Sequence, residues 1–257
     1  MPNTINIILF GETGVGKSSV INLIAGAPVA DVSPDVEGCT MASKEYKFTV
    51  DSKKYCIWDT VGLEEPEMGI NGYLDAIVKA LVLINRLTDA GGVNLLLFCM
   101  RGNRVTATTQ SNYRLFYEVL CGKQVPIALV ITHLERETHM EDWWSRNEKS
   151  IEKYGIKSAG HACVTGVDDR RENGKYAQSR VAIHELLKNC DGYGTYTMPP
   201  EAWFVRVLQG LGLFAGAKGP PKGKKLMETL TKRCRLEPAA ASRIISQIEQ
   251  SLPHIGS

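Results

Sequence analysis

The chain has 257 residues, of which 44% are hydrophobic and 23% charged, a composition suited to a globular domain with or without an extension. Its formal net charge of +2 argues neither for nor against a polyanionic partner. Seven cysteines without C-x-x-C spacing argue against a disulfide framework and a zinc site. The chain shows no secretory leader and no apolar run of about 18 residues. We therefore expect a cytoplasmic protein without a transmembrane segment.

Short apolar runs alternate along the chain with segments of helical length and spacing. The predicted strands are residues 5–10, 47–50, 55–59, 93–100, 125–132 and 161–165. The predicted helices begin at Lys17 and span 73–87, 109–120, 139–154 and 175–189. Strands 47–50 and 55–59 should form a hairpin. This alternation predicts an α/β fold with a mostly parallel central sheet flanked by helices, which binds its ligand at the carboxyl ends of the strands.

The alternation breaks at "DGYGTYTMPP", residues 191–200. We therefore expect a first domain over 1–195 and a helical C-terminal extension over 196–257 that contains a basic Pro/Gly linker. The apolar segment 203–214 is expected to pack on the first domain, with a partner or a membrane surface as the alternative. The basic linker lacks interleaved aromatic residues, so we expect no nucleic-acid partner.

The stretch "GETGVGKSS", residues 11–19, fits the phosphate-binding pattern G-x-x-x-x-G-K-[ST] and lies between a predicted strand and a predicted helix, as the motif requires. Its backbone N–H groups and the helix N-terminus should face the β-phosphate, while Lys17 spans the β- and γ-phosphates. The Ser18 hydroxyl is the expected Mg²⁺ ligand. The residues expected to contact the nucleotide here are Glu12, Thr13, Gly14, Val15, Gly16, Lys17, Ser18 and Ser19.

A second motif, "WDTVG" at 58–62, ends a predicted strand. Asp59 is the candidate carboxylate on the magnesium side of the site, and Gly62 could offer its N–H to the γ-phosphate because no side chain obstructs it. A turn without function is the alternative for a D-x-x-G pattern alone. The phosphate loop upstream favours the functional interpretation.

The polar, irregular segment between these motifs, residues 31–43, is typical of a switch segment that responds to the γ-phosphate. Thr40 is the best candidate for completing the magnesium shell. Ser33 and Ser43 are alternatives, and Thr40 could also be an ordinary loop threonine.

The segment "THLER", residues 132–136, follows the strand that should adjoin the base. Guanine presents two parallel donors, N1–H and N2–H₂, which the Glu135 carboxylate can accept together, whereas adenine presents an acceptor at N1. His133 could lie against the base, and backbone N–H groups from Val164 through Thr165 to Gly166 could bond guanine O6. A solvated loop glutamate is the alternative for Glu135.

With "GETGVGKSS", "CT", "DTVGL" and "THLE" in this order, residues 4–190 resemble the septin-like branch of GTPases, and among these the GIMAP proteins and the Toc receptors of the chloroplast envelope. The resemblance implies a Ras-like P-loop G domain that binds GTP and Mg²⁺ and forms a homodimer across its nucleotide face. The sequence departs from the usual N/T-K-x-D guanine motif. It also lacks a counterpart of the relatives' C-terminal membrane anchor, although peripheral membrane contact stays open.

Leu63 follows D-x-x-G where Ras-type enzymes place a water-orienting glutamine. An arginine could supply the missing charge stabilisation, and Arg101 and Arg104 lie just past a predicted strand. Arg104 aligns best with the arginine of the GIMAP "GRYT" segment, which acts across a dimer, so the expected catalytic residues are Lys17, Thr40, Gly62 and Arg104. The alternative for Arg104 is a surface arginine.

The sequence thus predicts an Mg²⁺-dependent GTP hydrolase that acts as a molecular switch and that homodimerisation could activate. The alternative is a nucleotide-dependent assembly module with little hydrolysis, which Leu63 favours. An ATP-using P-loop enzyme is a third interpretation, and the position of Glu135 argues against it. The sequence does not identify an effector protein.

Overall fold

The computed structural model describes residues 4–30, 44–60, 82–103, 105–167 and 174–190, together with short stretches of the C-terminal part. Those stretches are residues 192–197, 199, 202–203, 224–228, 231–232, 238–239, 241–242 and 245–246. Expectations for Thr40, Gly62, Leu63 and Arg104 lie outside the described residues.

A six-stranded sheet with the order β2-β3-β1-β4-β5-β6 forms the centre of the molecule, and β2 alone among these strands runs antiparallel to its neighbour. The strands are β1 (Ile5–Phe10), β2 (Lys44–Val50), β3 (Lys53–Asp59), β4 (Leu95–Arg101), β5 (Ile127–Thr132) and β6 (Gly160–Cys163). The named helices are α1 (Lys17–Ala25), α3 (Ala107–Tyr113), the π-helix η1 (Arg114–Leu120), α4 (Glu141–Lys153), α5 (Lys175–Asn189) and α7 (Lys224–Glu228). The α/β fold predicted from the sequence is confirmed.

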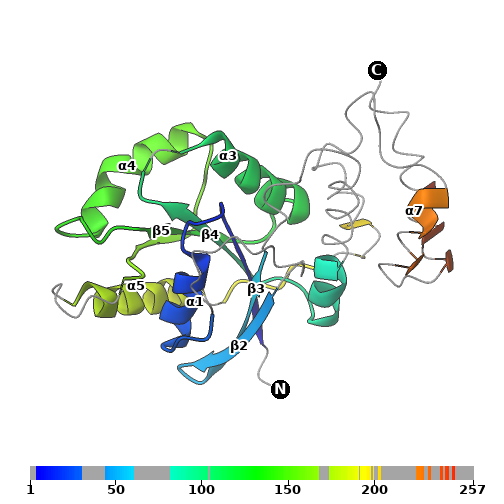
Figure 1. Cartoon of the computed structure of the whole chain (residues 1–257), viewed down its shortest axis with the longest axis horizontal. Helices are drawn as coiled ribbons and strands as arrows, with labels where there is room; N and C mark the ends of the chain where they lie inside the picture. The colour runs from blue at the N-terminus through cyan, green and yellow to red at the C-terminus, as the bar shows by residue number, and fades with distance from the viewer. Residues whose placement is uncertain are drawn as a thin grey trace.

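Helices cover both faces of the sheet: α1 and α5 lie on one face, and α3 and α4 on the other (Figure 1). Because side chains alternate along a strand, β1 sends Ile7 and Leu9 to the α1/α5 side and Ile8 and Phe10 to the α3/α4 side. Phe10 stacks on Phe98 of β4, with ring centroids 4.7 Å apart. The central strands are buried on both faces, which explains their continuous apolar sequences.

The hairpin and most element bounds follow the sequence. β1 and α5 have the predicted bounds, and Asp51 and Ser52 form the two-residue turn of the β2–β3 hairpin with φ values of 47° and 66°. Residues 82–89 are helical, within and just beyond the predicted helix 73–87. The predicted helix 109–120 begins earlier, at 107, and its second half is a π-helix; the strand predicted at 161–165 ends at Cys163.

The start of the C-terminal part packs on the sheet domain. Tyr196 forms a β-bridge with Val93, and the fully buried Trp203 donates from Nε1 to the Leu120 carbonyl over 2.7 Å. Packing of the apolar segment is therefore confirmed for Trp203, while 204–214 lie outside the described residues. The boundary at 195 stays a prediction. Within the part of the chain that the structure describes, no helix is long and apolar enough to cross a bilayer.

Candidate nucleotide-binding site

The phosphate loop (P-loop, residues 11–18) joins β1 to α1 and depends on glycine at defined points. A Cβ atom at Gly11, where φ is 147°, would lie only 2.2 Å from the Cys99 carbonyl oxygen of β4. Gly14 and Gly16 also have positive φ values, 77° and 89°. The first glycine is therefore required by close approach to β4, and the other two by backbone conformation.

The Lys17 ammonium lies over the P-loop. Its Nζ donates to the carbonyl oxygens of Gly11 at 2.6 Å and Glu12 at 3.2 Å. Lys17, Ser18 and Ser19 form the first turn of α1, and the loop after β6 packs there so closely that a Cβ at Gly166 would lie 2.4 Å from the Ser19 Cβ. The structure thus brings the phosphate-loop lysine and serines to the carboxyl ends of the strands.

Asp59 ends β3 beside this loop and is 4% exposed. Burial raises the pKa of its carboxyl, while the positive charges of Lys17 and Lys44 and the Thr60 backbone N–H act in the opposite direction. Among the described residues its buried Oδ1 has no hydrogen-bond partner. A buried carboxylate oxygen without a donor among the described residues, within electrostatic reach of Lys17, fits a divalent cation that carries phosphate.

The end of β5 holds the opposite side of the P-loop. The buried Thr132 hydroxyl donates to the Val15 carbonyl at 2.6 Å and lies 3.2 Å from the Met100 carbonyl oxygen. His133 follows with a φ of 60°, and its Cε1 would lie 3.6 Å from a Cβ at Gly16. Burial and the charge of Arg101 lower the pKa of His133, against the opposing effect of Glu135, so a neutral imidazole faces the loop at neutral pH.

Glu135 is held from two directions. Its Oε2 accepts from the Thr165 hydroxyl at 3.3 Å, and its backbone carbonyl accepts from Lys175 Nζ at 2.8 Å. The Thr165 N–H in turn donates to the Ser179 hydroxyl of α5 at 2.9 Å. His133, Glu135 and Thr165, which the sequence predicts as base-contacting residues, are thus placed in one region.

Two details differ from the expectations. The N–H of Val164 donates to the Ile131 carbonyl at 2.8 Å, and the N–H of Thr165 is used by Ser179, so neither is available for guanine O6. The β5–β6 ladder and α5 take these two donors, and the part of the prediction that concerns Gly166 stays a prediction. The Glu12 side chain also turns away from the phosphate loop and accepts from the hydroxyls of Thr106 and, at 2.5 Å, Thr109.

Four residues that hold the site together carry no functional assignment from the sequence. These are Thr106, Thr109, Thr132 and Lys175. Only Thr106 leaves a signal in the sequence, because threonine is a favoured N-cap residue shortly before a predicted helix. Thr106 and Thr109 form a reciprocal capping box at the start of α3.

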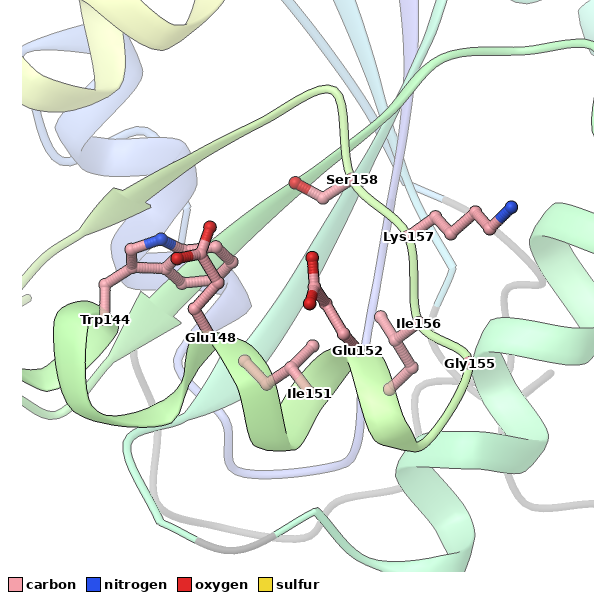
Figure 2. A pocket seen from close by; sticks show the side chains of 8 residues that line it. All are labelled: Trp144, Glu148, Ile151, Glu152, Gly155, Ile156, Lys157 and Ser158. Carbon is pink, nitrogen blue, oxygen red and sulfur yellow. The ribbon is translucent and has the colours of Figure 1, made fainter.

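A cavity of about 390 Å³ lies at a different place, between the second half of α4 and the connection into β6 (Figure 2). Its lining residues are Trp144, Glu148, Ile151, Glu152, Gly155, Ile156, Lys157 and Ser158. Trp144 stacks on His161 with ring centroids 4.0 Å apart. None of the predicted nucleotide-site residues lines this cavity, which adjoins the amino end of β6 rather than the carboxyl ends where the P-loop lies.

Comparison with known proteins agrees with this geometry. A family model described as 50S ribosome-binding GTPase matches residues 6–133, about half of the chain. GTPase Der of Campylobacter fetus is 30% identical over 166 residues, which are 65% of this chain and 33% of that protein. GTPase Der of Campylobacter jejuni strain RM1221 is 29% identical over 257 residues, 97% of this chain and 52% of that protein. The chain therefore spans about a third to a half of the length of these curated relatives.

Solved structures share the fold. Toc33 from Arabidopsis thaliana, a dimerisation-deficient mutant, superposes with a TM-score of 0.52 at 21% identity, over 73% of this chain and 83% of that one. Toc33 in complex with Mg²⁺ and GMPPNP gives a TM-score of 0.51 at 20% identity, over 80% and 85%. Together with the strand order and the phosphate loop, these matches identify the sheet domain of this chain as a P-loop GTPase G domain with a Ras-like fold.

Proposed function

We propose that the protein binds GTP with Mg²⁺ and hydrolyses it to GDP and phosphate, acting as a molecular switch. The observation that carries the proposal is the position of His133 against Gly16 of the P-loop, followed two residues later by Glu135 with its carboxylate bonded to Thr165. One Glu135 oxygen accepts from Thr165, and the carboxylate keeps acceptor capacity for the two parallel donors of guanine. The neutral His133 ring offers an uncharged face for a base.

The phosphate side supports the same reaction. Ser18, Asp59 and Thr40 would hold the ion, and bound Mg²⁺ would neutralise charge on the β- and γ-phosphates. Lys17 can exchange its P-loop carbonyls for phosphate oxygens, because its ammonium already lies over the loop. Gly62 would add a backbone N–H at the γ-phosphate.

For hydrolysis we propose that Arg104 acts in trans within a GTP-dependent homodimer, because Leu63 occupies the position of the usual glutamine. In the solved relatives atToc33 and psToc159, dimerisation is important for the GTPase activity. We also propose placement in the septin-like branch near the GIMAP and Toc groups, and a cytoplasmic location. Leu63 equally supports the second candidate, an assembly module with little hydrolysis.

The base preference is tested by measuring the affinities of GTP, ITP and ATP for the wild type and Glu135→Ala. Inosine lacks the N2 amino group, so the wild type should bind GTP roughly tenfold more tightly than ITP, the value of one charge-assisted hydrogen bond. Glu135→Ala should bind the two equally. Glu152→Gln serves as the control, because Glu152 is an exposed residue of α4. Tighter binding of ATP than GTP by the wild type would overturn the proposal.

Hydrolysis is tested by single-turnover phosphate release over a range of protein concentrations. A rate that rises with wild-type concentration and is low and constant in Arg104→Ala supports the trans-acting arginine. Equal rates at all concentrations would exclude it. Tight GTP binding without phosphate release at any concentration would favour the assembly module.

A further inference from the structure

The Glu12 side chain lies in an unusual environment for a P-loop residue. Its Oε1 accepts hydrogen bonds from the hydroxyls of both Thr106 and Thr109, the latter at 2.5 Å, at the first turn of α3. Its backbone carbonyl meanwhile accepts from Val15 N–H at 3.3 Å and from Lys17 Nζ at 3.2 Å. Glu12 therefore joins the turn of the P-loop to a helix that begins 95 residues later in the chain.

Both hydroxyls lie within hydrogen-bond distance of Glu12 Oε1, and their two oxygens lie 2.8 Å from each other. Thr106 Oγ1 already accepts the Thr109 N–H at 3.0 Å, and Thr109 Oγ1 accepts the Thr106 N–H at 3.4 Å. Each hydroxyl accepts one backbone N–H and keeps one proton, and the carboxylate, which only accepts, is the charged acceptor within reach of both protons. The capping box of α3 thus also forms a double donor for Glu12.

This arrangement stabilises a negative charge that would otherwise oppose phosphate binding. A carboxylate within the P-loop would repel the phosphates of a bound nucleotide if it faced them. Two hydroxyl donors at the start of a helix stabilise it on the other side of the loop. Thr106, the N-cap of α3, also follows Arg104 by two residues in the sequence.

We propose that Glu12 is a positioning residue: through Thr106 and Thr109 it fixes the P-loop to the start of α3, so that nucleotide occupancy and the conformation of the first turn of α3 are coupled. The proposal rests on nucleotide binding at the P-loop. It gives the P-loop a direct connection to the N-cap that follows the candidate catalytic arginine by two residues in the sequence.

The test is a double-mutant cycle with Glu12→Ala and Thr109→Val, read as GTP and GDP affinity. Thr109→Val removes the donor and the 3.4 Å acceptor of the Thr106 N–H, but it keeps the shape of the side chain and the bond from the Thr109 N–H to Thr106 Oγ1. We expect each single variant to bind GTP roughly tenfold more weakly, the effect of losing a charge-assisted hydrogen bond, and the double variant to be no worse than the weaker single one. Glu12→Gln keeps an acceptor and should recover part of the affinity.

Thr108→Val is the matched control, because it changes the same atoms on the same helix and its hydroxyl bonds none of the described residues. Hydrogen exchange provides the second measurement. In the wild type and the control, GTP should slow amide exchange over 105–113, and in Thr109→Val this effect should be lost. Independent, multiplying effects on affinity, or no response of 105–113 in the wild type, would overturn the coupling.

Unfolding of the nucleotide-free protein separates this proposal from the proposed function. The same cycle in urea should show non-additive losses of stability whichever nucleotide the protein prefers. If the wild type bound ATP but no guanine nucleotide, the proposed function would fail and the affinity cycle would be run with ATP. Additive losses of stability would show that the Glu12–Thr109 contact is absent in solution.

Discussion

Replacing Thr132 by valine tests whether the end of β5 holds the P-loop in shape. The substitution keeps the size of the side chain and exchanges the hydroxyl for a methyl group. In the structure this hydroxyl is buried and donates to the Val15 carbonyl over 2.6 Å. A methyl carbon approaches a carbonyl oxygen to about 3.3 Å at the closest, so the loop must move away by about 0.7 Å, the difference between the two distances.

The expected cost follows from the bond that is lost. The Val15 carbonyl loses its donor at a buried position, which costs about 1–3 kcal/mol. At about 2–4 °C per kcal/mol for a domain of this size, the melting temperature should fall by several degrees. Displacement of the loop backbone should also weaken GTP binding, by roughly tenfold if about 1.4 kcal/mol of that cost falls on the binding-competent conformation.

Thermal unfolding and GTP titration of the same preparations provide the measurement. Thr49→Val is the control, because Thr49 is exposed on β2 and the same exchange of atoms removes no buried bond. Its stability and affinity should match the wild type within about 0.5 kcal/mol. If Thr132→Val behaved like this control, the reasoning that β5 supports the P-loop through its terminal hydroxyl would be refuted.

Three further predictions concern backbone space, protonation and the C-terminal part. Gly11→Ala should cost more than about 3 kcal/mol because of the 2.2 Å contact with β4, whereas Gly14→Ala, with nothing within 4 Å, should cost about 1–2 kcal/mol from its positive φ; equal losses in urea unfolding would contradict the contact argument. His133→Asn keeps a residue that tolerates positive φ. Because burial lowers the pKa of His133 in the folded state, the unfolded chain takes up a proton first as the pH falls. The stability of the wild type should therefore fall as the pH drops through about 6.5, and the stability of the variant should fall less over the same range. Trp203→Phe should lose about 2 kcal/mol in urea unfolding through its buried hydrogen bond and the space left behind, and no loss would contradict its packing on η1.

Strand positions were predictable from the sequence because burial on both faces leaves a direct signature. The run "INIILF" has the bounds of β1, and its alternate residues pack into the two separate cores. The helix predicted at 109–120 shows the limit of this approach. Its start depends on the Thr106 cap, and its π-helical half carries Phe116 onto the ring of Phe10, 4.3 Å away, a contact that helical spacing alone does not contain.

The sequence predicted which residues form the candidate site better than it predicted which partners their side chains and N–H groups bond. Local patterns indicated the P-loop, Asp59 and Glu135, and the structure places them around one edge of the sheet. The direction of the Glu12 side chain depends on partners 94 and 97 residues away in the chain. The use of the Val164 N–H within the β5–β6 ladder likewise depends on where β6 ends, which an apolar run does not fix to the residue.

The anion preference of the P-loop depends on how its carbonyl groups are occupied. Within the loop, the carbonyl oxygens of Gly11 and Glu12 accept from Lys17, and that of Val15 accepts from Thr132. Because donors on the protein hold these negative ends, less negative charge remains to oppose a phosphate at the loop and the helix N-terminus. Thr132 lies outside the nine-residue motif, as do the Thr106 and Thr109 partners of Glu12. The motif defines the N–H and ammonium donors to phosphate, while the end of β5 and the start of α3 hold the loop that carries these donors in place. A chain that keeps "GETGVGKSS" but loses these hydroxyls should therefore still match the motif and yet bind nucleotide more weakly.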